Sequence, residues 1–163
     1  MAFEGDLIPG VTQLYGFVPI LTLGLILGLY ELILIHRDEN FRGSHWFGHG
    51  VHSVILMMVA LFFVFNTEYF LTLTGLNNIE GFWSFVSNPW SVRIIIGLIL
   101  NIKMHAVSAV IKGGLRGSMT GGMAEHWTHT TIVSVLVVLA PLYWPLIATL
   151  LPEWASGTAP TTE

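Results

Sequence analysis

The stretch GLILGLYELILIHRDENFRGS, residues 24–44, has a counterpart in GLILNIKMHAVSAVIKGGLRGS, residues 97–118. After each RGS the chain enters a long apolar segment that opens with the pattern His-x-x-His. The match requires one residue of slack before RGS and a three-residue insertion after it. With the two RGS motifs aligned, Glu31 falls opposite His105. The repeat predicts two similar helical hairpins with the same orientation. A pseudo-twofold axis along the membrane normal would relate them.

Composition indicates a membrane protein. The chain has 163 residues, of which 53% are hydrophobic and 10% charged, whereas about a quarter of the residues in soluble domains are charged. Four apolar segments approach the ~20 residues that an α-helix needs to cross a bilayer. We therefore predict an all-α integral membrane protein, a four-helix transmembrane bundle made of two repeated helical hairpins. The expected spans are residues 11–35, 46–65 with a continuation to 73, 90–110 and 127–151.

The chain is expected to form a single membrane domain over residues 1–163, because its length suits one domain. Its repeat halves are residues 11–75 and 90–151. Between them, residues 76–89 are predicted to form a loop with a short interfacial helix. Prolines inside the first and last spans predict helix kinks, since proline removes a backbone donor. These prolines are Pro19, Pro141 and Pro145.

Orientation follows from the basic residues in the connections. Arg37 and Arg42 lie in the first connection, and Lys112 and Arg116 lie in the third. The positive-inside rule places both of these connections in the cytoplasm. The sequence therefore predicts a multi-pass protein of the cell membrane with both termini outside.

Several classes of function are excluded by residue content. The chain has no cysteine, which excludes disulfides, thiolate metal sites, iron–sulfur clusters and thiol catalysis. Its net charge of -4 excludes a nucleic-acid partner bound through overall basicity. The glycine-rich residues 113–122 lack the Gly-Lys-Ser/Thr of a phosphate-binding loop. The expected partners are the lipid bilayer and either other membrane subunits or further copies of this chain.

Ionisable side chains gather at one depth of the predicted bundle. Each His-x-x-His pattern opens a span, and residues three apart on a helix face the same way. One further candidate lies just over a turn before the end of each preceding span. In dimetal carboxylate bundles, two helices each supply one glutamate and two supply Glu-x-x-His. We therefore predict a mono- or dinuclear metal site near the cytoplasmic face. The predicted ligands are Glu31, His49, His52, His105, His126 and His129, with His45 and Glu125 as weaker candidates.

The ligand types restrict the cofactor. Imidazole suits iron, copper or zinc better than calcium or magnesium, and haem b held by one histidine from each of two helices is the alternative. Two structural readings compete with a metal. His105 can act as a hydrogen-bond partner between helices, and the partner of Glu31 can be Lys103. An ionisable group inside a span is rare and usually functional, which favours the metal site.

The predicted function is a membrane redox metalloprotein or a subunit of a membrane oxidoreductase. Three alternatives stand beside it: a haem-b membrane anchor or electron carrier, a metal-ion transporter subunit, and a non-catalytic accessory subunit of a larger membrane complex such as a copper monooxygenase. The residues indicate no catalytic group and leave open whether the chain is an enzyme.

Overall fold

The computed structural model describes residues 16–37, 46–111 and 127–156; within these ranges, nothing is described of the side chains of residues 34–37, 46–50, 105–111, 127 and 153. All regular structure in the described ranges is helical. The long helices are α1 (Phe17–Arg37), α2 (Trp46–Phe65), α4 (Pro89–Ile111) and α5 (Trp127–Ala148). The short elements are α3 (Thr67–Leu73), η2 (Leu76–Asn78), η3 (Gly81–Ser87) and α6 (Glu153–Ser156).

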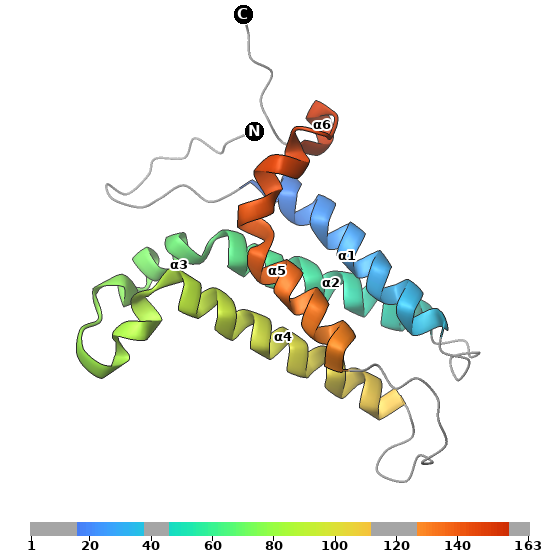
Figure 1. Cartoon of the computed structure of the whole chain (residues 1–163), viewed down its shortest axis with the longest axis horizontal. Coiled ribbons are helices and arrows are strands. Elements are labelled where there is room, and N and C mark those ends of the chain that lie inside the picture. The colour runs from blue at the N-terminus through green and yellow to red at the C-terminus, as the bar shows by residue number, and fades with distance from the viewer. Residues whose placement is uncertain (1–15, 38–45, 112–126, 157–163) are drawn as a thin grey trace, which may run out of the picture.

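The long helices pair as two hairpins (Figure 1). α1 packs against α2, and α4 packs against α5. α2 also contacts both α4 and α5, so it joins the two hairpins. The centre of the core is supplied by α2 and α5, whose largest fully buried apolar side chains are those of Met57, Leu61, Val64, Val133 and Val137. The short helix α6 returns to α1, where the Thr22 hydroxyl donates to the Ala155 carbonyl at 3.1 Å.

Glycines allow the two helices of the first hairpin to approach closely. A Cβ added at Gly28 would lie 2.7 Å from the Cα of Val54, and one added at Gly24 would lie 2.6 Å from the Cγ of Met58. Real Cβ atoms essentially never approach other atoms this closely. The helix axes are therefore nearer at these points than larger residues would permit, which is how small residues act in membrane helix pairs.

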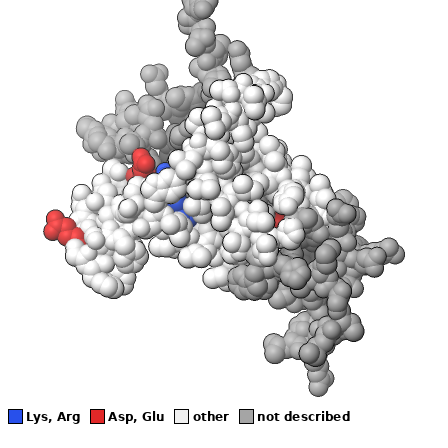
Figure 2. Space-filling view, viewed as in Figure 1, with Lys and Arg blue, Asp and Glu red and all other residues white. Residues whose placement is uncertain are grey.

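The outward faces of the long helices are apolar. On α1, one exposed stripe at helical spacing consists of Leu21, Leu25, Leu29 and Ile33. Comparable exposed leucine, isoleucine and valine side chains lie on α4 and α5. Figure 2 shows that the described part of the face in view is mostly uncharged, with two acidic groups toward the end where α3 lies and a small acidic patch on the opposite side. A helix that is apolar on both its inner and outer faces is typical of a lipid environment.

The expectation of four membrane-spanning helices is met only in part. In the described part of the chain, one helix is long and apolar enough to cross a membrane, residues 128–148. Two bent pairs would qualify if each counts as one span: residues 51–65 with 67–73, and 81–87 with 89–104. Residues 17–33 form a shorter apolar helix. By length and composition, the described helices therefore support one span and up to three.

Two sharp bends separate consecutive helices: α2 and α3 are bent by 65° beside Asn66, and η3 and α4 by 74° beside Asn88. The predicted continuation of the second span to residue 73 is therefore a separate helix, whereas the second bend falls where a short interfacial helix was expected to precede the third span. Pro141 and Pro145 lie inside α5, which is one uninterrupted helix, and the kinks predicted there stay a prediction. Pro19 lies in the first turn of α1, where its missing N–H removes no helix bond.

Candidate metal centre

The predicted ligands occupy the ends of the helices that were expected to carry them. Glu31 lies near the end of α1, and His105 lies near the end of α4. His49 and His52 lie in the first turns of α2, and His129 lies in the first turn of α5. Figure 1 shows these ends of the four helices on the same side of the molecule. His45, Glu125 and His126 lie outside the described residues.

Three of the predicted ligands have described side chains. Glu31 is buried, with 3% of its surface exposed, although it lies on an otherwise apolar helix. His52 and His129 are exposed. The burial of Glu31 is notable because a carboxylate is costly to bury without a polar or charged partner.

The alternative partner proposed for that carboxylate is Lys103. Lys103 is exposed on α4, whereas Glu31 is buried on α1. An ion pair between them stays a prediction, as does the metal.

The complete set of six ligands stays a prediction. Among the side chains that the structure describes, no group of three or more histidine, aspartate and glutamate residues is placed to hold a metal ion. Glu31, His52 and His129 therefore do not form such a group by themselves. The side chains of His49 and His105 are not described, and the convergence of the complete set stays a prediction.

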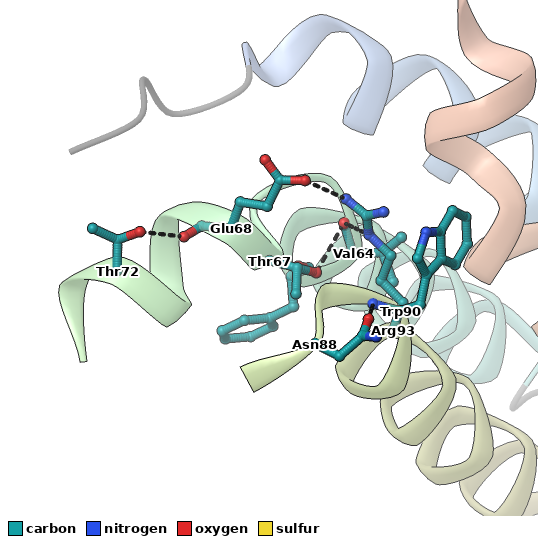
Figure 3. A network of polar contacts seen from close by, with 8 residues as sticks. Val64, Thr67, Glu68, Thr72, Asn88, Trp90 and Arg93 are labelled. Carbon is teal, nitrogen blue, oxygen red and sulfur yellow. Dashed lines mark hydrogen bonds and ion pairs between the residues drawn. The ribbon is translucent and has the colours of Figure 1, made fainter. Parts of the chain in front are cut away.

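The structure reveals a second polar cluster, at the bend between α2 and α3. The Arg93 Nε donates to the Val64 carbonyl at 3.2 Å, and Arg93 Nη2 lies 3.6 Å from Glu68 Oε1 (Figure 3). The Thr67 hydroxyl donates to the same carbonyl at 3.0 Å. The guanidinium also lies over the Trp90 ring, 5.0 Å from its centroid, in the position of a cation–π contact.

This cluster explains why the chain tolerates a bend there. A break in a helix frees backbone carbonyls, which must be satisfied by other donors when they are buried. Arg93 and Thr67 satisfy the carbonyl of Val64, and the Asn66 Nδ2 donates to the Phe62 carbonyl at 2.9 Å. Sequence reasoning did not predict this role. The only available signal was the polar run Asn66–Glu68 after a long apolar segment, together with one arginine inside the third span.

A further polar contact joins the helices of the second hairpin. The Asn101 Nδ2 on α4 donates to the Thr131 Oγ1 on α5 at 3.1 Å. Side-chain hydrogen bonds of this kind stabilise membrane helix pairs by about 0.6 kcal/mol on average.

Comparison with known proteins adds no family to these observations: no family model, no curated protein and no solved structure matches the chain.

Proposed function

We propose that this chain is a multi-pass membrane protein that binds a transition metal and serves as a redox metalloprotein or as a subunit of a membrane oxidoreductase. The observation that carries the proposal is the burial of Glu31 on α1. It lies at the end of the bundle where α2 and α5 begin with histidines. A metal ion held by imidazoles would accept this carboxylate as a further ligand.

The proposal of several spans rests on the length and composition of the helices. α1 has 21 residues and α4 has 23, which is enough for a helix to cross a bilayer. The apolar outward faces of the bundle support the same arrangement. With the basic residues of the first and third connections inside, both termini lie outside.

The helix contacts support the internal repeat. Aligning the two GLIL strings, a register that differs by one residue from the RGS alignment, places Gly28 opposite Asn101. Aligning the two His-x-x-His patterns places Val54 opposite Thr131. In the first hairpin, Gly28 packs closely against Val54. In the second, Asn101 donates a hydrogen bond to Thr131. Equivalent positions thus meet in both hairpins, as expected if the two pairs of helices pack in a similar way.

The proposal is tested by elemental analysis of the native purified protein together with its visible absorption spectrum. Stoichiometric iron, copper or zinc without a Soret band is the expected result. A Soret band with iron near one per chain would identify haem b in its place. Absence of a stoichiometric metal would overturn the metal site.

Variants locate the site within the chain. Glu31→Gln, His52→Ala and His129→Ala are expected to lose metal to similar extents. Glu68→Gln is the matched control, since Glu68 is an exposed carboxylate at the opposite end of the bundle and its variant should retain the metal. Metal loss in only one of the two histidine variants would contradict a site shared by both hairpins.

The exposure of two predicted ligands favours a second candidate function, that of an accessory subunit in a larger membrane complex. His52 and His129 are exposed on the single chain, and polar side chains on a lipid-facing surface are costly. A neighbouring subunit would cover them. Metal analysis of the intact complex and of the separated chain distinguishes the two functions: the accessory role predicts metal in the complex alone, and metal in both contradicts it.

A further inference from the structure

α4 and α5 approach each other at two successive levels. Asn101 lies opposite Thr131, as their hydrogen bond shows. One turn earlier on α4, a Cβ added at Gly97 would lie 2.4 Å from Val138 Cγ2 and 3.6 Å from the Ser134 carbonyl oxygen. Because α4 and α5 form an antiparallel hairpin, the Gly97–Ser134 level and the Asn101–Thr131 level are adjacent. Thr131 and Ser134 are three residues apart, so both lie on the side of α5 that faces α4.

Two polar atoms at this crossing have no hydrogen-bond partner among the described residues. Ser134 is 4% exposed, and its Oγ is buried and unbonded. The Oδ1 of Asn101 is also buried and unbonded, although Nδ2 of the same amide is engaged. Buried polar groups are nearly always hydrogen-bonded, through ordered water where protein partners are lacking. These two atoms therefore require a further partner.

The direction of the side chains brings the two atoms toward one another. The Cα–Cβ bond of a helical residue tilts toward the N-terminus of its helix. Ser134 therefore leans toward the level of Thr131, and Asn101 leans toward the level of Gly97. Because the two helices are antiparallel, these opposite tilts converge between the two levels.

The chemistry of the two atoms specifies what binds between them. The Oδ1 of Asn101 only accepts hydrogen bonds, so the ligand must donate one. The Ser134 hydroxyl both donates and accepts. All four residues at the crossing are neutral, and the contacts provide no carboxylate to compensate a bound cation. A cation would also need a shell of several oxygen ligands.

We propose that the α4–α5 crossing holds a bound water molecule, which donates to Asn101 Oδ1 and exchanges a hydrogen bond with Ser134 Oγ. Water needs two to four polar partners in a buried site, and the crossing supplies at least these two. The site is independent of the metal proposed above. It lies about one helical turn along α4 from His105, on the side nearer the middle of the bundle.

The first test is solid-state NMR of the labelled full-length chain in lipid bilayers, measuring magnetisation transfer from water. Transfer is expected at short mixing times to the Asn101 side-chain amide and to Ser134. Thr67 is the internal control, because its buried hydroxyl is bonded to the Phe63 and Val64 carbonyls at 2.8 and 3.0 Å and should receive none. In Ser134→Ala, transfer to Asn101 should be lost. Absence of transfer to both residues in the native chain would overturn the proposal.

The second test is thermal unfolding. If Ser134 Oγ is buried without a partner, Ser134→Ala removes an unsatisfied group and raises Tm. If it holds water, Ser134→Ala lowers Tm. In the double variant, adding Ser134→Ala to Asn101→Leu then lowers Tm little further than Asn101→Leu alone. A raised Tm in Ser134→Ala would overturn the proposal. A Tm that rises with sodium but not with choline, and only when Ser134 is present, would identify a cation and contradict the water.

Discussion

Polar residues at the two ends of the bundle differ in their burial and in their bonding partners. At the bend between α2 and α3, Arg93 is buried and bonded to a backbone carbonyl and to Glu68. At the opposite end, His52 and His129 are exposed. The first group has its partners within the chain, and the second group presents imidazoles at the surface.

This difference distinguishes a polar residue that stabilises the fold, Arg93, from polar residues that do not, the two exposed histidines. Arg93 supplies a donor at the point where the backbone of α2 is interrupted, so its cost of burial is offset by a bond that the bend requires. The exposed histidines satisfy no described backbone group. Their presence on an apolar bundle is better explained by a ligand or a neighbouring subunit, and the following variants test that distinction.

The largest effect is expected for Arg93→Met. Loss of the guanidinium removes a charged donor from the Val64 carbonyl and a partner from Glu68, at a cost of about 3 kcal/mol in the free energy of unfolding. Denaturant unfolding of the protein in detergent measures this. Lys103→Met is the matched control. Lys103 is an exposed cation on the same helix, so its replacement should leave the free energy of unfolding unchanged. Equal losses in the two variants would show that Arg93 acts only as a charge.

The next largest effect is expected for Gly28→Ala, in the first hairpin. The new methyl group would meet the backbone of Val54, which cannot move without shifting α2, and overpacking of this kind costs about 2 kcal/mol. Gly24→Ala is the matched control. Its methyl group would meet the Cγ of Met58, and this flexible side chain can turn aside. Unfolding of both variants in detergent should show a clear loss only for Gly28→Ala; similar losses would contradict the described helix contact.

Helix locations could be predicted from sequence because apolar length depends on local composition. The third span was expected at residues 90–110, and α4 runs from Pro89 to Ile111. The bend at Asn66 was not predicted, because the Val64 carbonyl beside it is bonded by Arg93, which lies on another helix 29 residues from Val64 along the chain. The helical state of residues 127–148 was predicted despite two prolines, and α5 continues through both because lost backbone bonds can be replaced by neighbouring groups.

The candidate site was predictable in position but not in geometry. The His-x-x-His spacing placed His52 and His129 at helix starts, and α2 and α5 have them there. Whether their imidazoles reach a common centre depends on how the two hairpins dock. Docking is decided by side-chain contacts between helices, such as those of Met57 and Val133 in the core, and a repeat in the sequence does not specify it.

A smaller effect is expected for Thr67→Val. The change removes one of the two donors to the Val64 carbonyl while Arg93 remains, so we expect a loss of about 1 kcal/mol. Thr72→Val is the matched control, since the exposed Thr72 hydroxyl donates to the Glu68 carbonyl at 3.0 Å within its own helix. Unfolding of the two variants under one set of conditions makes the comparison. A larger loss for Thr72→Val would contradict the role assigned to the Thr67 hydroxyl.

The smallest effect is expected for the double variant of His52→Ala and His129→Ala, measured in the presence of a metal chelator. Both side chains are exposed, so removing them should change the free energy of unfolding by less than about 0.5 kcal/mol. With the metal bound, the native chain gains stability from the ligand and the variant does not. A stability difference that appears only with metal therefore assigns these histidines to binding. A large loss of unfolding free energy in the presence of chelator would show that these histidines, like Arg93, stabilise the fold.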